Sequence, residues 1–211
     1  MRYRAVLFDV DGTIVDSQRA VLKAFEKVLG ELGLPAPDAQ LKESALRGPG
    51  LRVLEGLGVK NAKEVGLRWG EYCAQEEKQL FPGIARVLRE LREAGVQLGI
   101  VTSRTACETE MDPPVKSVLP MFDARVCAGE TSRPKPAPDP VLLCLHRLGA
   151  RAEETLYIGD SPTDQQSALA AGVDFALAVW GARDASMHAK YFPQCPEDVL
   201  SIARIPTRQF A

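Results

Sequence analysis

The feature that most constrains the fold of this chain is a series of short apolar segments, several of which show no polar alternation. A strand that is covered on both faces has such a sequence, as in a parallel sheet. The later segments are separated by helical patterns, and in Gly83–Ala94 and Asp139–Leu148 apolar residues recur at spacings of three and four. Strands that alternate with helices indicate a doubly wound α/β fold with a parallel sheet. The predicted strands are Arg4–Val10, Val96–Val101, Arg125–Ala128, Thr155–Ile158 and Phe175–Val179.

The segment from residue 16 to residue 79 departs from this alternation. It contains helical patterns and no convincing strand, and its first amphipathic helix ends at Gly33, Pro35 and Pro37. Such a connection is far longer than a normal loop between a strand and a helix. We therefore predict a helical cap domain (residues 16–79) over the carboxyl edge of the sheet of a core domain (residues 1–15 and 80–211). Further cap helices are predicted at Ala39–Arg47, Leu51–Leu57 and Ala62–Lys78.

The segment Asp-Val-Asp-Gly-Thr, residues 9–13, follows the first predicted strand directly. Side chains two positions apart on a strand point to the same side, so the carboxylates of Asp9 and Asp11 can face one site. The structural alternative is a strand that ends in a turn, where Asp and Gly are common. Two adjacent carboxylates suit phosphoryl transfer, because one can attack phosphorus while the other transfers a proton. Carboxylates also repel phosphate, so the site needs a cation, and oxygen ligands favour Mg²⁺.

Two further clusters can supply groups that bind phosphate. Thr102, Ser103 and Arg104 follow the second core strand, where a hydroxyl and backbone N–H groups can hold phosphate oxygens. Lys135 lies between two prolines in the proline-rich loop 131–140. The prolines restrict the conformations of the loop and so hold the ammonium group in place. A solvated lysine and a polar strand end are the structural alternatives.

A fourth cluster, residues 159–164, follows the predicted strand Thr155–Ile158. Local structure explains most of it, with Ser161 as a helix N-cap, Pro162 as the first helical residue and Asp164 in the first turn. This explanation leaves out Asp160, a carboxylate at a strand end that is a natural third oxygen donor for Mg²⁺. The strand-end clusters share the edge of the sheet where open α/β folds bind ligands.

Together these clusters resemble the four ordered motifs of the haloacid dehalogenase-like superfamily. The resemblance covers nearly the whole chain, and it is closest to phosphoglycolate phosphatase-like enzymes, which have a Rossmann-like core and a helical cap. It implies that Asp9 is the nucleophile and Asp11 the general acid/base. It also implies that Thr102 and Lys135 hold the transferring phosphoryl group. The carboxylate at Asp11 disfavours dehalogenation, because family members that cleave carbon–halogen bonds lack it.

The resemblance further implies a set of metal ligands. Mg²⁺ would be held by the carboxylate of Asp9, the main-chain carbonyl of Asp11 and the carboxylate of Asp160. Asp164 would orient the lysine or belong to the metal shell. The sequence departs from the family pattern at Ser103, where many relatives have Asn, and at Glu108–Pro114, where two prolines interrupt a helix.

These observations predict a Mg²⁺-dependent phosphatase that hydrolyses a small-molecule phosphate (phosphoglycolate-like, sugar phosphate or pyrophosphate) through an aspartyl phosphate. Two alternatives stay open. A phosphomutase of the β-phosphoglucomutase type shares all four motifs, and a non-catalytic binding protein can have the same fold. A receiver-like signalling domain also has an acidic Mg²⁺ site, but the long helical insertion argues against it.

The composition excludes several classes of partner. The net charge of -2 provides no positive field for nucleic acid or a membrane surface. Five cysteines at wide spacings, with no C-x-x-C pair, argue against a disulfide framework or a zinc site. No apolar stretch is long enough for a signal sequence or a membrane span. We therefore expect a cytoplasmic enzyme with a small-molecule partner, as a monomer or a homodimer.

Arg47 lies between two predicted cap helices, where its guanidinium would reach a second anionic group of a substrate. The structural alternative is a helix C-terminus, with Gly48 as its end. If Arg47 binds substrate, Arg47→Ala raises KM for a phosphorylated acid more than for a small neutral phosphomonoester. Steady-state kinetics with both substrates measures this difference, and equal effects on the two KM values would show that Arg47 does not recognise the acid.

Overall fold

The structure is a computed structural model, and it describes residues 3–47, 50–184 and 186–203. The chain forms two compact units, which we call the core unit (Met1–Asp16 and Leu80–Ala211) and the inserted unit (Ser17–Gln79). Among the described residues, no helix combines the length and the apolar composition that a membrane crossing requires.

The core unit is built on a five-stranded sheet in the order β5-β4-β1-β6-β7, with parallel pairing throughout. This confirms the predicted doubly wound α/β fold. The strands coincide with the five apolar segments to within a few residues at each end. They are β1 (Ala5–Phe8), β4 (Gln97–Val101), β5 (Ala124–Val126), β6 (Thr155–Gly159) and β7 (Asp174–Leu177).

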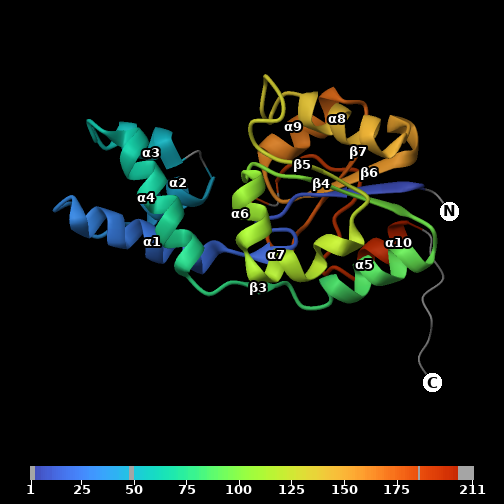
Figure 1. The fold of residues 1–211 in the computed structure, drawn as a ribbon, viewed down its shortest axis with the longest axis horizontal. Helices are drawn as coiled ribbons and strands as arrows, with labels where there is room; N and C mark the ends of the chain where they lie inside the picture. Colours follow the sequence, from blue (N-terminus) through green and yellow to red (C-terminus); the bar gives the residue numbers. More distant parts are fainter. Residues whose placement is uncertain (1–2, 48–49, 185, 204–211) are drawn as a thin grey trace. The chain divides into compact units, whose positions relative to one another are not determined.

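Helices cover both faces of this sheet, which explains why its strands lack polar alternation (Figure 1). On β1, Val6 and Phe8 pack against one helical layer, while Ala5 and Leu7 pack against the other. All four side chains are fully buried. The first layer contains α5 (Ile84–Glu93), α7 (Pro113–Val118) and α10 (Asp198–Ile202), and the second contains α8 (Asp139–Leu148) and α9 (Pro162–Ala170).

The central strand β1 defines the position of the candidate site. It pairs with β4 on one side and β6 on the other, and Phe8 is in register with both Ile100 and Ile158. The chain first adds β4 and β5 on one side of β1 and then crosses to add β6 and β7 on the other. Ligands bind at such a reversal, beyond the carboxyl ends of the strands. The residues that directly follow β1, β4 and β6 therefore share one edge.

The interruption predicted at Glu108–Pro114 is a break between two short helices. The first, α6 (Ala106–Met111), begins with a capping box in which Thr105 accepts from the backbone N–H of Glu108. The second, α7, begins at Pro113, where the missing N–H and the fixed φ of proline suit a first helical position. Asp112 lies between the two helices and is buried.

The inserted unit is helical and has its own apolar core. Phe25 stacks on Trp69 with ring centroids 4.5 Å apart, and the indole nitrogen donates to the carbonyl of Val21 at 3.1 Å. Its helices are α1 (Gln18–Glu31), α2 (Ala39–Arg47), α3 (Gly50–Gly56) and α4 (Ala62–Gln75). Where the chain enters and leaves the inserted unit, β2 (Val15–Asp16) and β3 (Gln79–Leu80) pair as a two-stranded sheet. That this unit covers the candidate site as a cap stays a prediction.

Helix α8 offers a matched pair of leucines that tests the packing of the second layer. Leu145 is 6% exposed and Leu142 is 47% exposed. Leu145→Ala should lower the free energy of unfolding by about 2–5 kcal/mol, because it leaves a cavity against the sheet. Leu142→Ala should cost about 1 kcal/mol or less. Denaturant unfolding followed by circular dichroism measures both changes, and equal costs would contradict this packing.

Candidate active site

Three strand ends deliver the predicted residues to one edge of the sheet. Asp9 follows β1, and its N–H donates to the carbonyl of Ile158 at 2.9 Å, so the ladder continues one residue past the strand. Asp160 directly follows β6. Thr102 follows β4, and its N–H donates to the carbonyl of Val126 at 3.0 Å. Backbone hydrogen bonds thus fix the start of the segments after β1 and β4, as parallel strands in register require.

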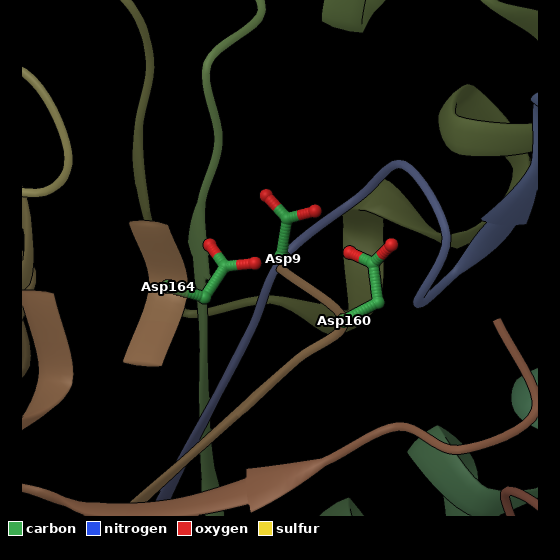
Figure 2. A group of neighbouring side chains, drawn as sticks. All are labelled: Asp9, Asp160 and Asp164. Carbon is green, nitrogen blue, oxygen red and sulfur yellow. The ribbon is translucent and has the colours of Figure 1, made fainter. Parts of the chain in front are cut away.

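Three carboxylates gather at this edge. One oxygen each from Asp9, Asp160 and Asp164 lie within 4.8 Å of one another. Figure 2 shows the three carboxyl groups directed toward a common region, with Asp9 between the other two. Asp9 is supplied by the end of β1, Asp160 by the end of β6, and Asp164 by the first turn of α9.

The loop after Asp9 passes directly against Asp160, and Gly12 allows this approach. Its φ is +76°, and a Cβ at this position would lie 2.1 Å from Oδ2 of Asp160. A side chain would therefore be strained and would also collide with the carboxylate. The glycine of the first motif is needed for the proximity of two motifs that are distant in sequence.

Lys135 is buried between two of the carboxylates. Its Nζ lies 2.7 Å from Oδ1 of Asp9 and 2.6 Å from Oδ1 of Asp164, and the lysine side chain is only 5% exposed. The carbonyl of Val101 and the hydroxyl of Tyr157 each lie 3.3 Å from the same nitrogen. Burial acts to lower the pKa of Lys135, but the charges of Asp164 and Asp9 outweigh it and raise that pKa. The ammonium group therefore stays charged at neutral pH.

Asp164 is held by four donors. Its Oδ1 accepts from Lys135 and, at 2.8 Å, from the hydroxyl of Tyr157. Its Oδ2 accepts from the Ser161 N–H at 3.1 Å and from the Ser161 hydroxyl at 2.5 Å. Ser161 is the N-cap of α9 and Pro162 follows in its first turn, which confirms the predicted local structure. A carboxylate with four donors favours the role of orienting the lysine over that of a metal ligand.

The three residues of the cluster after β4 differ in their surroundings. Thr102 is buried, and its Oγ1 accepts from the N–H of Arg104 at 3.1 Å. Ser103 is exposed. The guanidinium of Arg104 lies against Asp11, with Nε 2.7 Å from Oδ2 and Nη2 2.6 Å from Oδ1. Its Nη1 donates to Oδ2 of Asp112 at 2.6 Å.

The electrostatics of the cluster fit a divalent cation. Burial, with the charges of Asp164 and Asp11, raises the pKa of Asp9 to about 7, although Lys135 opposes this rise. Burial and the charges of Asp9 and Asp164 also raise the pKa of Asp160 well above its usual range. One ammonium thus does not balance the carboxylates around it. Converging carboxylate oxygens with surplus negative charge are the donor set that Mg²⁺ prefers.

The contacts of three residues near the site were not predicted from the sequence. Tyr157 lies within an apolar strand and looks like a core residue, and Asp112 lies in the proline-rich interruption. Trp180, which follows β7, donates from its indole nitrogen to the carbonyl of Thr13 at 3.0 Å. Next to it, a Cβ on Gly181 would lie 1.8 Å from the carbonyl oxygen of Gly12. These last two contacts brace the loop that follows Asp9.

The side chain of Arg47 lies outside the described residues.

Comparison with known proteins gives consistent matches across this chain. A family model described as haloacid dehalogenase-like hydrolase matches residues 6–178. Pyrophosphatase PpaX of Oceanobacillus iheyensis is 26% identical over 96% of this chain and 97% of its own length. The phosphoglycolate phosphatase of Aquifex aeolicus is 31% identical over 94% of this chain and 92% of its own length. The crystal structure of a putative phosphoglycolate phosphatase from Lactobacillus plantarum matches with a TM-score of 0.86 and 29% identity, covering 96% of this chain and all of that one.

The raised pKa values predict how the stability of the metal-free protein depends on pH. Between the ordinary value of 3.8 and the folded value of about 7, Asp9 binds more protons in the folded protein than in the unfolded one. Stability from this group is therefore lost as the pH rises through that interval. In thermal unfolding with EDTA, the melting temperature should be lower at about pH 8 than at about pH 5.

The variant Asp160→Asn separates this effect from general changes with pH. It removes one charge from the cluster, so its melting temperature should fall less between the same two pH values. Glu55→Gln, on the exposed face of α3, removes one acid far from the cluster in sequence and should follow the wild type. If the melting temperature of Asp160→Asn falls as much as that of the wild type, repulsion among the carboxylates of the cluster does not cause the loss of stability.

Proposed function

The chain belongs to the haloacid dehalogenase-like hydrolase family, and on this premise we propose that it is a Mg²⁺-dependent phosphatase for a small-molecule phosphate. The observation that carries the proposal is the position of Lys135, buried between Asp9 and Asp164, with Asp160 beside them. A nucleophilic carboxylate, a fixed positive charge and a set of oxygen ligands for a metal meet at one strand edge. Phosphoryl transfer through an aspartyl phosphate uses this combination.

In the first step, a carboxylate oxygen of Asp9 attacks the phosphorus atom and the bond to the leaving oxygen breaks. The Asp9 carboxylate thereby becomes an aspartyl phosphate. Asp11 gives a proton to the leaving oxygen, so that the product departs as an alcohol or as inorganic phosphate. Lys135 and Thr102 hold oxygens of the transferring group, and the ammonium group offsets the charge that develops on them.

In the second step, a water molecule attacks the phosphorus of the aspartyl phosphate. Asp11 now accepts a proton from this water, and the bond between phosphorus and Asp9 breaks. Inorganic phosphate leaves, the carboxylate of Asp9 is restored, and Asp11 is again the protonated acid with which it began the first step. The use of one carboxyl group as acid and then as base follows from its position beside the reacting atoms in both steps.

Asp9, Asp160 and the main-chain carbonyl of Asp11 would hold the Mg²⁺ ion. When bound, the ion supplies positive charge that reduces the repulsion between the nucleophile and the phosphate. The surplus negative charge that raises the pKa values of Asp9 and Asp160 supports this assignment. Asp164 contributes by orienting Lys135, because four donors already occupy its oxygens.

The relatives support a proposal for the substrate class. Phosphoglycolate phosphatases and PpaX pyrophosphatases match over nearly the whole chain, which supports a phosphoglycolate-like compound, a sugar phosphate or pyrophosphate as the substrate. We propose that the enzyme acts as a monomer or a homodimer in the cytoplasm. All five cysteines lie in the described part of the chain and none forms a disulfide, which fits a reducing compartment.

The proposal predicts that phosphate release depends on both a metal and Asp9. With p-nitrophenyl phosphate and Mg²⁺, Asp9→Asn should lower kcat by about 10³-fold or more, because the amide cannot act as the nucleophile. EDTA should abolish the activity of the wild type, and Mg²⁺ should restore it. Colorimetric detection of the released product measures each rate. The matched control Asp38→Asn, an exposed aspartate near the start of α2, should retain wild-type kinetics.

Three results would contradict this function or its mechanism. Activity that persists in EDTA or in Asp9→Asn would exclude the proposed mechanism. A coupled isomerisation assay with a hexose 1-phosphate covers the remaining case, since product formed without free phosphate would identify a phosphomutase. If neither activity occurs over a broad panel of phosphates, the chain is a binding protein on this fold.

A further inference from the structure

The ion pair between Arg104 and Asp11 joins the residue expected to bind phosphate to the residue expected to transfer protons. We propose that Arg104 is a positioning residue that holds the carboxylate of Asp11 in place for proton transfer, and that it does not bind the phosphate. This inference rests on the proposed function, because it concerns the acid/base of that reaction. It assigns a role to an arginine that sequence analysis had placed in the substrate site.

The geometry of the pair fixes the orientation of the carboxylate. Nε of Arg104 contacts Oδ2 of Asp11 at 2.7 Å, and Nη2 contacts Oδ1 at 2.6 Å. Two parallel contacts between a planar guanidinium and a planar carboxylate restrict both the position and the plane of the acid.

Arg104 is the anchored partner in this pair. Its side chain is 13% exposed, whereas that of Asp11 is 43% exposed. Arg104 also has a fixed backbone, because its N–H donates to Thr102 and its carbonyl accepts from the N–H of Ala128 at 2.8 Å. The pair therefore differs from exposed ion pairs, which contribute little to structure.

Asp112 holds the other end of the guanidinium. Its Oδ2 lies 2.6 Å from Nη1 of Arg104, and its side chain is only 4% exposed. The residue itself is fixed at the start of α7, where its carbonyl accepts from the N–H of Lys116 at 2.8 Å. Asp112 and Asp11 thus form ion pairs with different nitrogens of the guanidinium. The break between α6 and α7 therefore has a structural consequence, because it places a buried carboxylate beside Arg104.

Direct binding of phosphate by Arg104 is the competing explanation. Each of the three guanidinium nitrogens already donates a hydrogen bond to Asp11 or Asp112. A phosphate would have to displace one of these charged contacts or use the remaining donors. The two explanations predict different kinetics, because a phosphate ligand acts on binding and a positioning residue acts through the acid that it orients.

A double-mutant cycle between Arg104 and Asp11 tests the proposal, with kcat and KM measured at saturating Mg²⁺. Asp11→Asn should lower kcat by about 10²–10⁴-fold, the range for loss of a general acid/base. Arg104→Ala should lower kcat by about 100-fold, as a misplaced catalytic group does, with KM changed by less than about threefold. In the Asp11→Asn background, Arg104→Ala should produce no further loss of kcat.

The outcomes separate this inference from the proposed function. Losses of kcat that multiply in the double variant, or a KM for phosphate substrates raised by about tenfold or more in Arg104→Ala, would show that the arginine acts on the substrate. Either result overturns the inference while the phosphatase function stands. A wild type without phosphate release overturns the proposed function, and with it the role of Arg104.

Additional variants guard against a loss of folding. Arg104→Ala leaves Asp112 buried without its cation, which can destabilise the core. Asp112→Asn retains the shape of the side chain and should lower kcat through the same pathway, again with no effect in the Asp11→Asn background. Arg104→Lys keeps the charge but cannot contact both oxygens of Asp11, so its kcat should stay below that of the wild type. The control Arg92→Ala, which removes an exposed arginine paired with Asp123, should retain wild-type kinetics. Thermal melts of all variants show which of them are folded.

Discussion

The pairing of the buried Lys135 ammonium with Asp9 and Asp164 is the interaction on which the rest of the site depends. A charge at this depth is costly unless opposite charges and hydrogen bonds surround it. The partners come from separate parts of the chain: the end of β1, the first turn of α9 and, through the Val101 carbonyl, the end of β4. The sheet register and the start of α9 must therefore both be correct before the lysine can be buried.

Two groups of paired opposite charges lie at this edge of the sheet. In the first, one lysine faces several carboxylates, and the imbalance favours a cation. In the second, Arg104 faces Asp11 and Asp112, and the charges hold an acid in one orientation. The acidic residues of this edge thus differ in what constrains them. Asp164 is fully satisfied by donors, Asp11 is held by a guanidinium, and Asp9 and Asp160 retain the surplus charge.

The parts of this structure that sequence analysis predicted are those that leave a local pattern. Apolar segments predicted the strands, and the N-cap serine and following proline predicted the start of α9. Contacts between distant residues leave no such pattern. Arg104 and Asp11 are separated by 93 positions, so the sequence showed two motifs but not their pairing. Tyr157 was missed because a buried tyrosine in a strand is indistinguishable from a packing residue until its hydroxyl has a known partner.

The pairing of β2 with β3 has a consequence for how such a chain can diversify. The two ends of the inserted unit leave and rejoin the core as neighbouring strands, so the core needs only a short closure between Asp16 and Gln79. The loop-closure entropy of a long insertion grows slowly with its length, and a unit with its own apolar core adds stability of its own. A different helical module can therefore be exchanged at this junction while the carboxylates of the core keep their register, so the inserted unit can change without any change in the core.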